Sequence, residues 1–175
     1  MYEGLSIIHY PDPRLKVRSK PVEQIDDSIR QLAAVMLELM RREKGVGLAA
    51  AQVGVNLRLF VMNHDGIPES DRVVINPTVE FIEGTEEDEE GCLSIPDVRI
   101  KVLRSGTARL TGFDEQARPI DLTENGFVAR IWQHEYDHLD GVLLTDRMSM
   151  LDKMGWRKKL KGMEAVFDAG KAKKR

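Results

Sequence analysis

The sequence predicts an α+β fold in which antiparallel β-sheets pack around a central helix, with one further helix towards each end of the chain. Three observations lead to this prediction. Residues 29–40 hold an apolar stripe at helical spacing, six short β-like runs follow between residues 57 and 122, and a second helical pattern begins after residue 125. Because no long helix separates the six runs, we expect neighbouring strands to pair antiparallel.

The first helix is predicted to begin at Asp26-Asp27-Ser28, since these side chains are suited to capping the free N–H groups of a first turn. Gly45 is expected to end it. Its buried face repeats apolar residues every three or four positions, and it consists of Ile29, Leu32, Ala33, Met36, Leu39 and Met40.

The six strand-like runs are separated by Gly, Pro or Asp, and they comprise residues 57–62, 73–75, 79–82, 98–102, 108–110 and 120–122. An acidic segment, residues 83–90, lies between the third and the fourth run. We expect it to be a solvated loop because its like charges repel. Glu90 is the exception, and we expect it to pair with Arg99 or Arg104 and so to hold the loop that carries Cys92.

The second helix carries the most informative motif, His134-Glu135-Tyr136-Asp137-His138. Positions i and i+4 of a helix lie on one face, so the two imidazoles are suited to holding one metal ion, with Glu135 as a base between them. A helix here is supported by the start signal Asn125-Gly126 and by helical spacing of Phe127, Val128, Ile131 and Trp132. An ordinary helix with two unrelated histidines is the alternative that the motif alone leaves open.

A catalytic metal site of this kind has three protein ligands and one open position. Downstream of His138 there is no further histidine and no glutamate before Glu164, so the third ligand is expected upstream. The candidate is Cys92, the single cysteine, in Glu90-Gly91-Cys92-Leu93-Ser94, because a thiolate binds borderline-soft divalent ions strongly. The alternative for a lone cysteine is a small buried hydrophobic residue.

A third segment, Gly45-Val46-Gly47-Leu48-Ala49-Ala50-Ala51-Gln52, combines glycines, small residues and one amide. It lacks the Gly-Lys-Ser/Thr ending of a phosphate loop. A helix end followed by a tightly packed turn accounts for the glycines. It does not account for Gln52, a polar residue that is suited to hydrogen bonding in a crowded site.

These three segments, the last extended from Gln133 to Gly141, resemble the motifs of the peptide deformylases. The resemblance runs from about residue 5 to about residue 150, and it includes Ile8-His9-Tyr10-Pro11 and Val74-Ile75-Asn76-Pro77. It implies a metal-dependent hydrolase that removes the formyl group from the N-terminal formyl-methionine of newly made polypeptides and releases formate. Arg130 and Trp132 lie in a stretch that varies within the family, and they are expected to reshape the substrate pocket.

The resemblance also implies a role for each site residue. The metal ligands would be Cys92, His134 and His138. The catalytic residues would be Glu135, which moves the proton, with Gln52 and the backbone N–H of Leu93, which stabilise the oxyanion. The substrate would be contacted by Gly47, Val46, Phe127 and Ile131. The implied metal is iron, Fe2+, one per chain, with Zn2+, Ni2+ or Co2+ as substitutes.

Two other classes of protein compete with this interpretation. A zincin-type endopeptidase would share the histidine motif, but the missing downstream ligand and the cysteine segment argue against it. A ribosome-associated binding module with a vestigial site would have lost its base or a ligand. Here the whole set is present, namely Gln52, Cys92, His134, Glu135 and His138.

The bulk composition indicates one globular domain over residues 1–175, since 42% of the residues are hydrophobic and 31% are charged. No apolar run approaches a membrane span, and Met1–Leu5 lacks the start of a signal peptide. One cysteine cannot cross-link a fold, and a thiolate ligand needs reducing surroundings. We therefore expect the protein to be located in a cytoplasm of the bacterial type. We also expect a monomer.

Charge concentrates at the C-terminal end. Residues 151–175 carry nine Lys or Arg and three Asp or Glu, whereas the whole chain has a net charge of −3. Their apolar spacing predicts a basic helix at about residues 150–175. One interpretation is a solvated helix whose basic residues favour its negative end. The resemblance implies the other, a transient contact with the ribosome.

Overall fold

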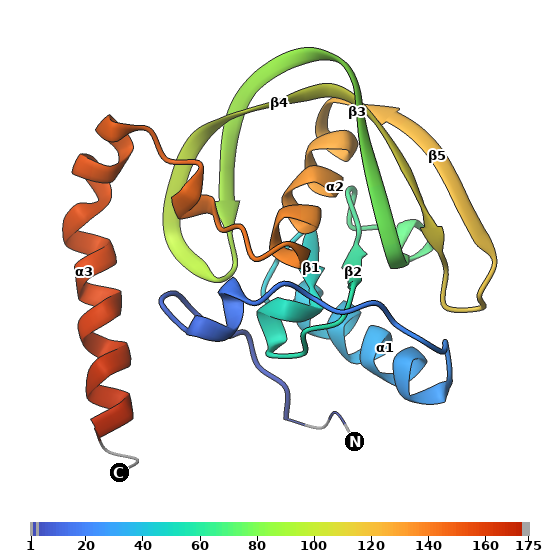
Figure 1. Ribbon diagram of the computed structural model, residues 1–175, viewed down its shortest axis with the longest axis horizontal. Coiled ribbons are helices and arrows are strands. Elements are labelled where there is room, and N and C mark those ends of the chain that lie inside the picture. Colours follow the sequence, from blue (N-terminus) through green and yellow to red (C-terminus); the bar gives the residue numbers. More distant parts are fainter. Residues whose placement is uncertain (1, 3, 173–175) are drawn as a thin grey trace.

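The computed structural model describes residues 2 and 4–172, and it has the predicted α+β architecture. A five-stranded antiparallel sheet has the order β1-β2-β3-β4-β5. Its strands are β1 (Gly47–Ala49), β2 (Leu59–Met62), β3 (Arg72–Cys92), β4 (Ile95–Phe113) and β5 (Pro119–Asn125). The helices are α1 (Asp27–Arg42), α2 (Gly126–Leu139) and α3 (Met150–Ala172). Figure 1 shows the long, bent β3 and β4 curving around α2, with α3 at one side.

α1 begins where its capping residues predict, because the Asp26 side chain accepts a hydrogen bond from Ile29 N at 3.1 Å. The helix ends at Arg42, before Gly45, whose N–H still donates to Met40 O at 2.9 Å. All six residues of the predicted apolar face are buried, and they pack against the apolar side chains of β1 and β2.

The predicted runs 73–75 and 79–82 are parts of one strand, β3, and the runs 98–102 and 108–110 are parts of β4. The break between the first two runs is a register shift at Ile75/Thr78, not a chain reversal. Between the other two runs, residues 103–107 continue the pairing with β3. β1 was not predicted as a strand, because its three residues are too few to show an alternating pattern.

The prediction of a loop for the acidic segment 83–90 is wrong, since these residues form the distal part of β3. The facing strand β4 carries basic residues that offset the like charges. Glu89 Oε1 lies 3.4 Å from Arg99 Nη1, and Glu87 Oε2 lies 3.8 Å from Lys101 Nζ. Cross-strand pairs of opposite charge stabilise a sheet, so the acidic segment can form a strand although its side chains are exposed to solvent.

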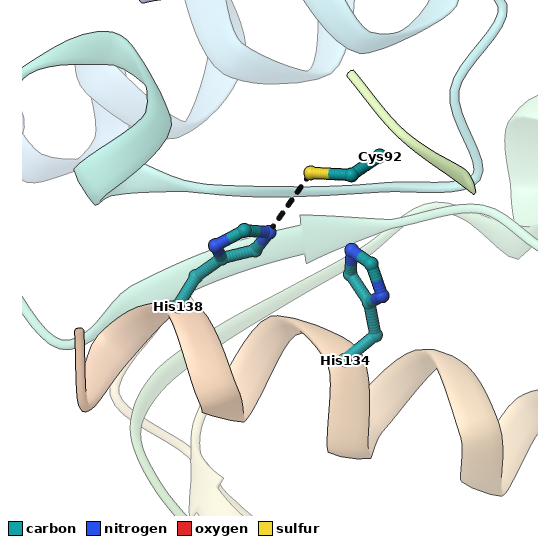
Figure 2. Close-up of side chains that lie close together, drawn as sticks. All are labelled: Cys92, His134 and His138. Carbon is teal, nitrogen blue, oxygen red and sulfur yellow. Dashed lines mark hydrogen bonds between the residues drawn. The ribbon is translucent and has the colours of Figure 1, made fainter. Parts of the chain in front are cut away.

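α2 is the central helix, and it contacts all five strands. Ala129, Ile131, Trp132 and Leu139 pack in a core with Phe60 of β2 and residues of β3 and β4. Burial of this apolar face fixes the rotation of α2, so His134 and His138 point towards Cys92 at the end of β3 (Figure 2).

α3 follows at the predicted place, and no described residue in it is fully buried. Trp156, Leu160 and Met163 are partly buried against a core that includes Cys92 and Ile95. The last predicted residues of this basic helix, 173–175, lie outside the described residues. Among the residues that the structure describes, no helix is long and apolar enough to cross a membrane.

Candidate active site

Three side chains from two distant segments converge at the motif helix. Cys92 stands at the end of β3, and His134 and His138 stand one turn apart on α2. Cys92 Sγ lies 3.3 Å from His138 Nε2, and one donor atom of each of the three residues lies within 4.8 Å of the other two. Figure 2 shows both imidazoles pointing from α2 towards the cysteine. The predicted ligand set is thus brought together.

The three donors fit a divalent metal ion in chemistry and in spacing. A sulfur and a nitrogen that bind one tetrahedral ion at ordinary bond lengths lie about 3.5 Å apart, close to the separation of Cys92 Sγ and His138 Nε2. Burial, followed by the nearby charge of His134, lowers the pKa of His138 well below its usual value. Its ring is therefore neutral at pH 7 and has a lone pair for a metal.

Glu90 organises the surroundings of His134. Its carboxylate oxygen Oε2 lies 2.9 Å from His134 Nδ1, and Arg104 donates to the carboxylate through Nε and Nη2, both at 2.9 Å. Burial works to raise the pKa of Glu90, but hydrogen bonds from Arg104 and His134 outweigh it and hold that pKa far below its usual range. The predicted pairing of Glu90 with Arg104 is confirmed, whereas Arg99 pairs with the neighbouring Glu89.

Arg130 is a third partner of Glu90 that sequence reasoning missed. Its Nη1 donates to Glu90 Oε1 at 2.8 Å and to Val102 O at 2.8 Å, and its Nη2 donates to Glu86 O at 2.7 Å. Arg130 lines the cavity described below, as predicted. Trp132 does not line it, because its indole is buried in the core and donates to Met62 Sδ at 3.1 Å. The signal that the sequence offered for a buried ion pair was Arg130 itself, a single charged residue among the small or apolar residues Val128, Ala129 and Ile131.

Gln52 lies in the 3-10 helix η2 (Ala50–Val53), directly after β1, and is buried. Its Oε1 accepts a hydrogen bond from Ala49 N at 2.8 Å, so its Nε2 is the end that faces the site. Nε2 lies 3.5 Å from Cys92 Sγ and 3.3 Å from Ser94 Oγ. The amide is therefore held in one orientation with its N–H groups beside the cysteine.

Glu135 lies between the two histidines with its side chain buried against β1. A Cβ placed on Gly47 would lie 2.8 Å from Glu135 Cδ, so only glycine leaves room for the carboxylate. Burial raises the pKa of Glu135 to about 7. Its Oε2 has no hydrogen-bond partner among the described residues. A buried carboxylate with a free oxygen and a raised pKa is suited to accepting and returning a proton.

A cavity of about 660 Å³ opens beside these groups. Gln52, Cys92, His134 and Glu135 line its deep end. The other predicted substrate and oxyanion residues line it too, and they are Val46, Gly47, Leu93, Phe127 and Ile131. Ile131 is buried, whereas Val46 and Phe127 are exposed near the mouth. His138 is buried behind the lining, and His64 is exposed away from it.

Comparison with known proteins identifies the class. The family model described as polypeptide deformylase matches residues 5–154. The chain belongs to the polypeptide deformylase family. A peptide deformylase from Alkalilimnicola ehrlichii is 46% identical over 159 residues, which cover 89% of this chain and 88% of that protein. The predicted extent of the resemblance is confirmed.

Solved structures agree with this family. A peptide deformylase from Legionella pneumophila superposes with a TM-score of 0.86 at 37% identity, over 93% of this chain and 96% of that one. A peptide deformylase from Plasmodium falciparum gives a TM-score of 0.90 at 34% identity, over 94% of this chain and 98% of that one. Members of the family remove the N-terminal formyl group from nascent polypeptides with the help of a metal ion. This deformylase is accordingly a metal-dependent hydrolase that acts on formylated nascent peptides.

Proposed function

We propose that Cys92, His134 and His138 are the three protein ligands of the catalytic metal ion. The observation that carries the proposal is the approach of their donor atoms to within 4.8 Å of one another at the end of a cavity. A divalent ion bound there would supply a Lewis acid and would lower the pKa of a coordinated water towards neutrality.

The metal that we propose is Fe2+, one per chain, with Zn2+, Ni2+ and Co2+ as working substitutes. One thiolate and two imidazoles form a donor set that accepts any of these ions, so ligand softness does not select among them. The choice of iron comes from the family resemblance. A site with a thiolate also needs reducing surroundings, which supports a cytoplasmic location.

Glu135, Gln52 and Leu93 carry the chemistry in this proposal. Glu135 accepts the proton of the attacking water and later delivers it to the amine that leaves. The Gln52 amide and the backbone N–H of Leu93 donate hydrogen bonds to the formyl oxygen as it gains negative charge. One such donor contributes about 3–4 kcal/mol in a transition state. The fixed orientation of the Gln52 amide supports its role, because no reorganisation is needed as charge develops.

The substrate lies along β1 in this proposal. Gly47 contacts the substrate backbone, which adds to the edge of the sheet and is recognised through main-chain hydrogen bonds. Val46, Phe127 and Ile131, with Leu93, contact the methionine side chain. The apolar surface that these residues present to the cavity supports this assignment. Apolar contacts of this kind give a graded preference for methionine over other side chains.

We also propose that residues 1–175 form one catalytic domain that works as a monomer and touches the ribosome transiently through α3. Contact between α2 and all five strands supports a single domain. The basic side chains of α3 and its exposed apolar residues Met150, Leu151 and Met154 support a surface for an external partner.

Turnover of two peptides tests the proposed activity. Formyl-Met-Ala-Ser should release formate and a free amine, whereas an internally quenched peptide without a formyl group should stay intact. Cleavage of the second peptide alone would reverse the assignment in favour of an endopeptidase. Lack of turnover of either peptide by the metal-loaded enzyme would favour a binding module.

A further inference from the structure

α3 lies beside the active-site cavity, and two of its contacts join it to residues that line the cavity. Trp156 Nε1 donates to Arg99 O at 3.1 Å, and Lys159 Nζ lies 2.8 Å from Asp97 Oδ2. Arg99 and Asp97 both line the cavity. Figure 1 shows α3 next to the turn between β3 and β4, which carries the cysteine segment. The helix therefore borders the cavity on the side of Asp97 and Arg99.

A second hollow of about 640 Å³ runs between α3 and the N-terminal segment. We refer to it as the α3 groove. Its α3 side is formed largely by Gly162, Met163, Val166 and Phe167, and its other side includes Ile7 and His9. Val166 is 75% exposed, so this apolar surface is open to solvent. An apolar surface that water reaches favours a ligand with apolar side chains.

The α3 groove adjoins the active-site cavity. Ile7 and His9 line both hollows. Lys159 lines the groove and is ion-paired with Asp97, which lines the cavity. The groove is therefore within reach of a chain that leaves the cavity beside Ile7 and His9.

We propose that the α3 groove binds the downstream segment of the formylated polypeptide, in extended form and through its apolar side chains. The substrate of the family is a nascent polypeptide, so residues beyond the first few must cross the surface of the enzyme. Ile7 and His9, which line both hollows, place this exposed apolar surface next to the cavity. This inference rests on the proposed function of the adjoining site, and it adds a preference for chains with apolar residues beyond the formylated end.

Peptides of different length and tail test the groove. All begin with formyl-Met-Ala-Ser, and the extended ones continue for about six more residues, which span roughly 20 Å when extended. One tail contains leucines and the other contains serines. We expect the leucine tail to lower KM roughly tenfold at unchanged kcat, since apolar side chains leave water. The serine tail should match the short peptide.

A matched pair of variants locates the effect. A Cβ at Gly162 or at Gly155 meets no atom within 4 Å, and only Gly162 lines the groove. Glutamate also favours a helix more than glycine does, so both variants should fold. In Gly162→Glu the leucine tail should no longer lower KM, and turnover of the short peptide should stay unchanged. In Gly155→Glu the leucine tail should still lower KM, and turnover of the short peptide should again stay unchanged.

Equal KM values for the short and the leucine-tailed peptide would overturn the inference, as would a tail effect that survives Gly162→Glu. Either result would leave the proposed function intact, because the short peptide would still be deformylated. Failure of the wild-type enzyme to deformylate the short peptide would instead contradict the proposed function.

Discussion

Glu90 Oε2 lies 2.9 Å from His134 Nδ1, and this contact decides which nitrogen of the ring faces the site. When the ring of His134 is neutral and Nδ1 donates its proton to the carboxylate, Nε2 keeps its lone pair for a metal ion. Arg104 and Arg130 hold the carboxylate in place from two other directions. Glu90 is therefore a positioning residue that acts on the reaction through His134.

Replacement of Glu90 by glutamine should weaken metal binding. The amide loses the charge that orients His134. It also leaves the buried Arg130 without its carboxylate partner, whereas Arg104 keeps Asp137. We expect metal affinity to fall by about 10–100-fold, measured by competition with a chelator. Glu89→Gln is the matched control, because Glu89 is exposed and pairs with Arg99 at the surface. Equal metal affinity in the two variants would show that Glu90 does not orient a ligand.

Gly47→Ala should impair catalysis while the metal stays bound. The new Cβ would overlap the Glu135 carboxylate, which is enclosed and has to move. A displacement of about 1 Å of a catalytic group costs roughly a hundredfold in rate, so kcat should fall by about that factor. Gly45→Ala is a milder comparison, because there the new Cβ meets the flexible end of Leu93. A Gly47→Ala enzyme with normal kcat would contradict the proposed placement of the base.

Glu135→Gln should nearly abolish turnover and leave the fold and the metal content unchanged. The amide has the same shape as the carboxylate, but it cannot accept a proton. General acid–base catalysis contributes about 10²–10⁴-fold, and kcat should fall within that range. Deformylation kinetics and metal analysis on the same sample provide the measurement. Retention of more than about a tenth of the wild-type rate would assign the proton transfer to another group.

The sequence predicted the site better than it predicted the sheet. Ligand chemistry made a histidine motif on a helix and a lone cysteine candidates for one metal site, and the resemblance to a known family led us to expect that they converge. The acidic segment 83–90 was misjudged, because repulsion within one strand ignores the basic side chains of the strand beside it. Cross-strand partners are not visible from a single segment.

Arg130 was missed as a partner of Glu90 for a related reason. Its contacts join α2 to β3 and β4, and the register of those strands sets them, not any local pattern. The groove beside α3 was equally out of reach. It depends on how the last helix packs against the first residues of the chain, which the sequence of neither segment specifies.

The contact between Tyr10 and Glu164 should make stability depend on pH above neutrality. The Tyr10 hydroxyl donates to Glu164 Oε1 at 2.6 Å. This hydrogen bond, together with burial, raises the pKa of Tyr10 from an ordinary 10.0 to about 12. The folded state therefore binds more protons than the unfolded state between these values. The stabilising contribution is complete below pH 10 and is lost as pH rises towards 12.

Spectroscopic titration of tyrosinate checks this expectation. Subtracting the Tyr10→Phe titration from that of the wild type isolates one group with a pKa near 12. In Glu164→Gln the same group should titrate closer to pH 10, and the stability difference from wild type should shrink over that interval. A Tyr10 titration that is the same with and without Glu164 would show that α3 is not held by this bond.

Metal analysis combined with deformylation kinetics, on protein purified without air, tests whether Cys92, His134 and His138 hold the catalytic metal ion. We expect about one divalent ion per chain, turnover of formyl-Met-Ala-Ser in proportion to metal content, and X-ray absorption that shows one sulfur and two nitrogen neighbours. We also expect Cys92→Ala to lose the ion and the activity together. A Cys92→Ala enzyme with full metal content and full activity would contradict the proposed ligand set.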